Sequence, residues 1–538
     1  MTANRPESPI VTQAAPDGAD VPPLIRGLMS AAAFPHAVSG VQLVQTHISW
    51  VVLTGDYAYK IKKPVRFSFL DFSTLERREA ACREELRLNR LMTPELYLDV
   101  VPIVAGEGGP KLACPGTPIE YAVRMRQFSQ HLQLDRLLQA GELQAADLAA
   151  FGGELARLHA AARQAAIGSA FGEPAAAHAT VLECVHDLRR GAPGLDLHAD
   201  LDAIEHWLSQ AYSRLAPLLL NRKMQGRVRE CHGDLHLANL VKLDGEVRAF
   251  DRIEFSEELR WIDVISDIAF LVMDLDQRGH PALASAFLNA YLEAGGDYQG
   301  MRLLNYYLVY RALVRAKVAL IRCRGACAGQ RDADAAECAR YVRWAARRAG
   351  ERRHALLLMH GFAGSGKSWL SRELAAVLPA VQLRSDVERK RLNGLGSLQR
   401  SGSAVGAGIY TPSAGQQVYS RLAACAEDII EGGATALVDA TFLKRADRQR
   451  FMALARRLGA PFAIIDCRAP QDILERRVAE RLRLKSDASE AGPEVLHMQL
   501  ATDEALDQEE LTRTLSIDTA ISPSIPGLAE QLRNLPGM

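Results

Sequence analysis

The spacing of hydrophobic and polar positions divides the first 345 residues into different regions. Residues 22–130 show the period-two alternation of strands, with VQLVQTHISWVVLTGDYAYKIKK broken by a turn at 54–56, followed by the helical periodicity of LERREAACREELRLNRLM. EYAVRMRQF predicts one more strand. Residues 131–225 carry apolar side chains three and four positions apart, and residues 256–345 return to helical spacing. A strand-rich region therefore precedes a helical body.

Short apolar runs dominate the chain beyond residue 354. HALLLMHG, PAVQL, ATALVDA and PFAIIDC are separated by stretches with helical periodicity. Such alternation of strands and helices is typical of a parallel sheet that is covered on both faces. The C-terminal region is therefore predicted to be an α/β domain.

The length of 538 residues exceeds what one hydrophobic core usually organises, so more than one domain is expected. The polar, arginine-rich segment AARRAGERRH is typical of a linker between the two patterns. We predict a disordered tail at 1–22, a first domain at 23–342, a linker at 343–353 and a second domain at 354–538.

Composition narrows the class of protein. Lys plus Arg and Asp plus Glu both number 64, so no overall basic excess points to nucleic acid or to an anionic membrane. The longest apolar stretches are interrupted by arginine and lysine, and the N-terminus has no secretory pattern. Nine cysteines without paired CxxC motifs favour a reducing compartment. We expect a cytoplasmic protein without a membrane segment.

The segment ECHGDLHLANLVKLDGEVRAFDRIEF, residues 230–255, concentrates acidic and polar side chains around a turn. Phosphoryl transfer from ATP requires a carboxylate near the acceptor hydroxyl and oxygen ligands for Mg²⁺. Asp234, Asn239 and Asp251 supply such a set. The simpler reading, a solvated polar turn between helices, explains the order of these residues less well.

HGDLHLANL followed by FDRIEF resembles the catalytic loop and metal aspartate of the aminoglycoside phosphotransferase family, over roughly residues 40–340. The resemblance implies an α+β, kinase-like, two-lobed fold. It also implies that Asp234 is the catalytic base, that Asn239 and Asp251 bind Mg²⁺, and that His232 shapes the loop. In RWIDVISDIAF, Asp267 resembles the buried acid that supports such a loop.

A kinase-like domain also needs a lysine for the phosphates of ATP and a helix glutamate as its partner. Lys60 in YAYKIKKP and Glu85 in REELRLN are our choice, although Lys62 and Glu79 compete for these roles. The phosphate-covering loop of the family would fall at THISW. Ser49 is therefore a candidate contact to ATP.

A second phosphate-handling signature, GFAGSGKS, lies at residues 361–368 between an apolar run and a helical stretch. It fits G-x-x-x-x-G-K-[ST], the P-loop pattern, in which glycines let backbone amides surround phosphates at a helix N-terminus. In such a loop Lys367 neutralises phosphate oxygens and Ser368 binds Mg²⁺. The candidate nucleotide-binding residues are Gly361, Phe362, Ala363, Gly364, Ser365, Gly366, Lys367 and Ser368.

Charged residues after the next strands indicate transfer chemistry. Asp386 could accept a proton from an attacking hydroxyl, and Arg389 could hold an anionic acceptor. Asp439 ends a predicted strand, where a carboxylate can support Mg²⁺ or its waters. Arg477 and Arg481 share a helix face and could close over the transferred phosphate as a lid, although an Arg-rich face is commonly just solvated.

Residues 354–520 resemble the P-loop kinase group that includes polynucleotide kinase, zeta-toxin-like and gluconate kinase-like enzymes. The whole chain resembles two-domain bacterial proteins in which an aminoglycoside phosphotransferase-like domain precedes a P-loop ATPase or kinase domain. This resemblance implies ATP, Mg²⁺ and phosphotransfer, and it names no acceptor.

Three functions fit these patterns. The favoured one is an ATP- and Mg²⁺-dependent phosphotransferase with two nucleotide sites, acting on small-molecule or nucleotide-type hydroxyl acceptors. In the second, one domain catalyses while the other senses nucleotide and regulates it. The third, a nucleic-acid end-processing kinase, is not favoured because aromatic residues make up only 6% of the chain and its charge is balanced. No sequence feature specifies an oligomeric state.

Overall fold

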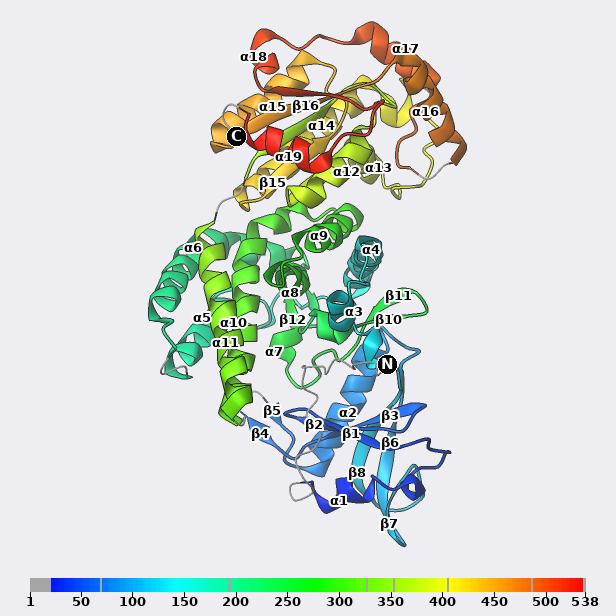
Figure 1. Cartoon of the computed structure of the whole chain (residues 1–538), viewed down its shortest axis with the longest axis vertical. Coiled ribbons are helices and arrows are strands. Elements are labelled where there is room, and N and C mark those ends of the chain that lie inside the picture. Colours follow the sequence, from blue (N-terminus) through cyan, green and yellow to red (C-terminus); the bar gives the residue numbers. More distant parts are fainter. Residues whose placement is uncertain are drawn as a thin grey trace, which may run out of the picture. The chain divides into compact units, whose positions relative to one another are not determined.

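The structure is a computed structural model that describes residues 21–67, 70–191, 195–325, 328–351, 354–403, 406–484 and 487–535. Contacts between residues divide the chain into two compact units. Unit 1 comprises Met1–Leu143 and Glu230–Ile262, and unit 2 comprises Gln144–Arg229 and Asp263–Met538. Figure 1 shows the elements of both units. The predicted tail, 1–22, lies outside the described residues apart from its last two positions.

Unit 1 is built on an antiparallel sheet with the strand order β1-β2-β3-β8-β6-β7. The predicted turn at 54–56 joins β2 to β3. The elements of the sheet and of the helices beside it are α1 (Pro23–Gly27), β1 (Gln42–Gln45), β2 (Ser49–Leu53), β3 (Tyr57–Lys62), α2 (Leu75–Asn89), β6 (Tyr97–Gly106), β7 (Gly109–Leu112) and β8 (Pro118–Arg126).

The remaining elements of this part of the chain are short. β10 and β11 form a hairpin, and β4 with β5 and β9 with β12 form two further strand pairs. The bounds of these elements are β4 (Arg66–Phe67), β5 (Leu70–Asp71), α3 (Leu134–Ala140), β9 (Val228–Glu230), β10 (Leu240–Leu243), β11 (Glu246–Ala249), α7 (Glu257–Arg260) and β12 (Trp261–Asp263).

Alternation along the strands decides which side chains meet α2. Along β8, Ala122 packs in the cluster that includes Ile25 of α1, whereas Val123 packs with Cys82 of α2. Lys60 of β3 lies directly opposite Val123 of β8. Residues opposite one another in an antiparallel pair point to the same face. The period-two pattern of β3 therefore directs Lys60 toward α2.

Unit 2 begins with a helical body. Its helix α8 is buried along nearly its whole length. None of the helices in the described part of the chain combines the length and the apolar character that crossing a membrane requires. The helices are α4 (Ala145–Ala161), α5 (Pro174–Gly191), α6 (His198–Met224), α8 (Val264–Gln277), α9 (Pro281–Gly295), α10 (Met301–Gly325) and α11 (Ala328–Gly350).

Helix α11 extends through most of the predicted linker at 343–353. Trp344 and Ala345 are buried, so this stretch packs as part of the body, and its Ala and Arg residues are good helix formers. Polar composition alone therefore misplaced the end of the helix. The helical part of this segment ends at Gly350.

The C-terminal part of unit 2 contains a parallel sheet with the strand order β14-β15-β13-β16-β17. The α/β fold that the sequence predicts for this region is therefore confirmed. The elements are β13 (Leu356–His360), α12 (Lys367–Val377), β14 (Ala380–Arg384), α13 (Ser385–Leu392), α14 (Pro412–Glu431), β15 (Thr435–Asp439), α15 (Arg445–Leu458), β16 (Phe462–Arg468), α16 (Gln471–Leu484), α17 (Pro493–Thr502), α18 (Gln508–Leu511), β17 (Thr514–Asp518) and α19 (Ile525–Arg533).

A fully buried arginine holds the helical body together. Arg222 of α6 donates to Asp263 at 2.7 Å and to Asp297 at 2.8 Å. We expect Arg222→Ala to lower the free energy of unfolding by about 3–5 kcal/mol, because it leaves two buried carboxylates without their cation. Asp202→Asn is the control, since breaking the exposed pair of Arg189 and Asp202 should cost at most about 1 kcal/mol. Denaturant titrations that give Arg222→Ala and Asp202→Asn the same loss of unfolding free energy would contradict this expectation.

Candidate active sites

The predicted catalytic loop brings Asp234 and Asn239 into contact. The side-chain amide of Asn239 donates to the carbonyl oxygen of Asp234 at 2.9 Å and to its Oδ2 at 3.0 Å. His236 Nε2 lies 3.4 Å from the same carboxylate oxygen. These contacts hold the Asp234 carboxylate in place. Its side chain is still 36% exposed and is therefore open to a bound molecule.

Backbone geometry explains the shape of this loop. Gly233 has φ +86°, and a Cβ there would lie 2.8 Å from the carbonyl oxygen of Leu259, so only glycine fits. Buried His232 donates from Nε2 to the carbonyl of Phe250 at 2.9 Å, while the Asp234 amide donates to its Nδ1 at 3.3 Å. These two bonds require the neutral tautomer with the proton on Nε2. His232 therefore ties the loop to the residue before Asp251.

Asp251 lies beside the loop in a conformation that few non-glycine residues adopt, with φ +62°. Its amide donates to the hydroxyl of Tyr97 at 3.0 Å. The amide of the preceding residue, Phe250, donates to the carbonyl of Asn239 at 3.0 Å. The backbone of Asn239 is thus hydrogen-bonded to the residue directly before Asp251, the other predicted Mg²⁺ ligand.

Lysines and carboxylates alternate along a buried chain of charges behind Asp251. Lys60 Nζ contacts Asp251 and lies 2.7 Å from Glu85 Oε1. Lys62 Nζ lies 2.5 Å from the other oxygen of Glu85 and also contacts Glu254. Glu85 is completely buried between the two lysines. The structure therefore brings together both lysines that the sequence left in competition.

The lysines and carboxylates of this buried chain of charges stabilise one another's ionised forms. Burial opposes ionisation of Lys60, but Asp251, Glu85 and Glu254 outweigh it and hold the lysine's pKa well above its ordinary value. Burial acts against the carboxylate of Glu85 as well, yet Lys60 and Lys62 lower its pKa to about 2. Both partners of the predicted pair are therefore charged at neutral pH.

Three other predicted residues occupy different surroundings. Glu79, the alternative to Glu85, pairs with Arg83 at 2.7 Å. Ser49 begins β2 and is fully buried, and its hydroxyl has no hydrogen-bond partner among the described residues, so this structure does not present it to a ligand. Asp267 is buried in α8 of unit 2, where its Oδ2 lies 3.1 Å from His159 Nε2.

Substitution of each lysine separates their roles. We expect Lys60→Met to reduce kcat/KM for ATP about 10²-fold or more, since Lys60 alone of the two contacts Asp251. We expect Lys62→Met to lower the free energy of unfolding by about 3–5 kcal/mol, because it leaves Glu254 unpaired in the interior. Steady-state kinetics and urea unfolding of both variants measure the difference. A folded Lys62→Met protein that loses as much kcat/KM as Lys60→Met would reverse the assignment.

The second site begins where β13 ends in the P-loop. Gly361 and Gly364 have φ +129° and +81°. A Cβ at Gly361 would lie 2.4 Å from the carbonyl oxygen of Cys467, and one at Gly364 would lie 2.6 Å from that of Leu474. These positions accept only glycine, because a side chain there would meet the backbone. A glycine-rich turn at the start of a helix is the geometry in which backbone amides can surround phosphates.

Lys367 at the end of this loop lies near Asp439, which ends β15. Lys367 Nζ donates to the carbonyl of Phe362 at 2.7 Å, and burial lowers the pKa of this lysine. Burial raises the pKa of Asp439, against the pull of Arg384, of a hydrogen bond with Ser368 and of Lys367. Ser368 and Asp439 therefore offer two adjacent oxygen groups, the donor set that Mg²⁺ prefers.

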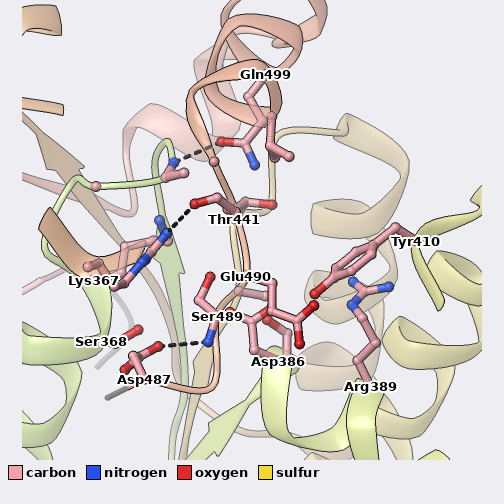
Figure 2. Close-up of a pocket in the computed structure, with 18 of the residues that line it drawn as sticks. Lys367, Ser368, Asp386, Arg389, Tyr410, Thr441, Asp487, Ser489, Glu490 and Gln499 are labelled. Atoms are coloured by element: carbon pink, nitrogen blue, oxygen red, sulfur yellow. Dashed lines mark hydrogen bonds between the residues drawn. The ribbon is translucent and has the colours of Figure 1, made fainter. Parts of the chain in front are cut away.

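A cavity of about 1060 Å³ opens in front of the P-loop. Figure 2 shows Lys367 and Ser368 on one side, Arg389 with Tyr410 on the other, and Asp386 between them. The predicted residues Gly361, Phe362 and Ser365 are not part of its wall. The predicted residues that line it are Ala363, Gly364, Gly366, Lys367, Ser368, Asp386, Arg389, Asp439, Arg477 and Arg481.

The predicted arginines of this site already have partners. Arg389 lies over the Tyr410 ring at 5.2 Å and donates to the carbonyl of Ile409 at 3.0 Å. Arg477 donates to the carbonyl of Thr519 at 2.7 Å, and Arg481 donates to that of Ala491 at 3.0 Å. All three residues line the cavity, and backbone carbonyls hold their guanidinium groups in place.

Sequence reasoning missed several residues of the cavity wall. Arg384 Nη2 donates to Asp487 at 2.9 Å, and its Nε lies 3.8 Å from Asp439. Glu490 accepts hydrogen bonds from the amide and hydroxyl of Ser401 at 2.9 and 2.6 Å. These residues carry no recognisable motif. Only the position of Arg384 at the end of PAVQLR, two residues before Asp386, hinted at a place beside the site.

Comparisons with known proteins agree with this geometry. Residues 57–304 match a family described as phosphotransferase enzyme family, and residues 356–506 match a family described as AAA domain. Uncharacterised proteins of Mycobacterium tuberculosis and Mycobacterium bovis are each 32% identical over 453 residues, which cover 84% of this chain and 88% of theirs.

Two solved structures show partial similarity to the chain. A choline/ethanolamine kinase family protein from Mesorhizobium loti is 12% identical, with 60% of this chain and 98% of that chain covered and a TM-score of 0.35. The APS kinase of Mycobacterium tuberculosis, solved with AMPPNP and APS, is 20% identical, with 34% and 98% covered and a TM-score of 0.26.

A kinase-like phosphotransferase domain followed by a P-loop domain defines the class of this protein as a two-domain phosphotransferase of the kinase type. The chain belongs to the same family as the mycobacterial proteins, with which it shares most of its length. The predicted two-domain architecture is therefore confirmed.

Proposed function

We propose that the protein is an ATP- and Mg²⁺-dependent phosphotransferase with two nucleotide sites, each of which passes a γ-phosphate to a hydroxyl acceptor. The observation that supports the proposal is that a candidate base carboxylate lies among candidate phosphate- and metal-binding residues in both regions. Asp234 contacts Asn239, and Asp386 shares a cavity with Lys367 and Ser368.

At the kinase-like site, Mg²⁺ would be held by Asn239 and Asp251 and would neutralise the charge of the phosphates. Lys60, kept charged by Glu85 and Asp251, would bind phosphate oxygens once a nucleotide competes for it. Asp234 would accept the proton of the acceptor hydroxyl while that oxygen attacks the γ-phosphorus and ADP leaves. Asp251 remains 42% exposed, which leaves it open to the metal.

At the P-loop site, the backbone amides and Lys367 would hold the phosphates, and Ser368 with Asp439 would hold Mg²⁺ directly or through water. Asp386 lines the cavity and has no hydrogen-bond or ion-pair partner within the described parts of the chain. A half-buried carboxylate without a protein partner is suited to take the proton of a hydroxyl acceptor. Arg389 on the far side would contact an anionic group of that acceptor.

The acceptors would be small molecules or nucleotide-type compounds. The cavity of about 1060 Å³ is large enough for a nucleotide and a small acceptor together. The protein would act in the cytoplasm, the location that the sequence predicts and where ATP and Mg²⁺ are present.

Two variants of the full chain test the proposal. Wild type, Asp234→Asn and Lys367→Ala would each be incubated with Mg²⁺ and γ-labelled ATP across a panel of metabolites, nucleotides and oligonucleotides. We expect each substitution to abolish a different labelled product. If Asp234→Asn changes no product while ATP still binds the kinase-like site, this site senses nucleotide and does not catalyse. Label on oligonucleotides alone would instead support the end-processing function.

A further inference from the structure

A side chain from α17 reaches the P-loop. Gln499 Oε1 accepts a hydrogen bond from the backbone amide of Ala363 at 2.8 Å. Figure 2 shows this contact as a dashed line above Lys367. Ala363 is the third residue of GFAGSGKS, and 136 positions separate it from Gln499. No motif in the sequence assigns a role to this glutamine.

The contact fixes one peptide unit of the loop from both ends. The carbonyl of Phe362 accepts from Lys367 Nζ at 2.7 Å, and the amide of the same peptide unit, on Ala363, donates to Gln499. In a P-loop the lysine ammonium binds the β- and γ-phosphates. Gln499 therefore contacts the part of the loop that borders the terminal phosphate and not the part that begins α12.

The NH₂ group of Gln499 takes no part in the contact with Ala363. Because Ala363 donates, the glutamine must accept through its oxygen, and its NH₂ group is directed elsewhere. This NH₂ group has no hydrogen-bond partner within the residues that the structure describes, and Gln499 lines the cavity. Two N–H donors thus border the space in front of the P-loop.

The arginines of α16 already have partners in the wall of the cavity. Arg477 and Arg481 of α16 are engaged with backbone carbonyls, and the adjacent lining residues of α17 are Val495 and Met498. A neutral donor here would gain little from the α- and β-phosphates, which the loop amides surround. It would gain most from the additional oxygens of a terminal phosphate.

We propose that Gln499 donates a hydrogen bond from its NH₂ group to the terminal phosphate of a nucleoside triphosphate on the P-loop, so that this site distinguishes ATP from ADP. The inference rests on the proposed function of the P-loop site. Gln499 is then a ligand-binding residue, and the amide of Ala363 is what orients it.

Affinities for ATP and ADP test this role without any turnover. Full-length wild type, Gln499→Ala and Gln499→Glu would be titrated with a non-hydrolysable ATP analogue and with ADP, both with Mg²⁺. Binding at the P-loop site would be identified as the part of the wild-type isotherm that is lost in Lys367→Ala. Gln499→Glu still accepts from Ala363 but brings a carboxylate to the phosphate. Thr502→Ala, an exposed change on α17, is the matched control.

We expect Gln499→Ala to weaken the ATP analogue about tenfold and Gln499→Glu to weaken it further, with ADP changed less than about twofold. Equal weakening of both nucleotides would mean that Gln499 only braces the loop, which would overturn the proposal. Unchanged affinities in both variants would also overturn it. If wild type has no isotherm that depends on Lys367, the proposed P-loop function itself fails.

Discussion

Replacement of Asp234 by Asn should reduce kcat at the kinase-like site by about 10²–10⁴-fold, the range that general base catalysis supplies. The substitution keeps the shape of the side chain and its contact with Asn239, so the loop should stay intact. Only the ability to accept a proton is lost. Labelled phosphate transfer to the acceptor found in the panel measures kcat, and titration with ATP should give an affinity close to that of wild type.

Asp202→Asn is the matched control, since this exposed carboxylate pairs with Arg189 on the surface of α6. It should leave both kcat and nucleotide affinity unchanged. A loss of ATP affinity in Asp234→Asn equal to its loss of rate would contradict a role in proton transfer and would indicate that Asp234 holds the metal.

Lys367→Ala should reduce transfer at the P-loop site by about 10²–10³-fold, because it removes the cation that stabilises charge on the transferred phosphate. The lysine is buried and its pKa is lowered by that burial, so its removal also relieves a cost of folding. We therefore expect the free energy of unfolding to change little while nucleotide binding falls. Steady-state transfer and calorimetric titration measure the two effects.

Lys444→Ala is the control on the same domain, since Lys444 is half-exposed and pairs with Glu504 at 3.2 Å. It should leave both quantities at the wild-type value. A Lys367→Ala protein that retains full transfer, or one that unfolds as readily as Arg222→Ala, would contradict the assignment of Lys367 to the nucleotide.

Local patterns explain why so much of both sites could be predicted. Alternation in YAYKIK placed Lys60 on the face of the sheet that α2 covers, and helical spacing placed Glu85 toward it. GFAGSGKS between a strand and a helix determines its own geometry, because its glycines adopt backbone angles that other residues rarely adopt. Such signals lie within a few consecutive residues, and no distant partner is needed to read them.

Tertiary contacts account for what the sequence could not show. β17 was missed because it is a half-exposed edge strand whose TLSID lacks the apolar character of the other strands. Lys62 was left as a rival of Lys60 because its partner Glu254 lies 192 positions away. Gln499 meets the P-loop only through the fold. The helical end of the predicted linker was missed because its arginines mask the buried Trp344.

The order of synthesis matters for the kinase-like site, because unit 1 is assembled from two separate stretches of the polypeptide. Lys60 and Asp251 are 191 positions apart, so the ribosome must release the intervening helices before the two charges can meet. Until then the ion pairs of this cluster are limited to those that Glu85 makes with Lys60 and Lys62. Pairings across such separations form late and slowly. The sheet itself spans only residues 42–126, so its strands can pair early, whereas the contact of Lys60 with Asp251 is expected to be among the last parts of the kinase-like site to form.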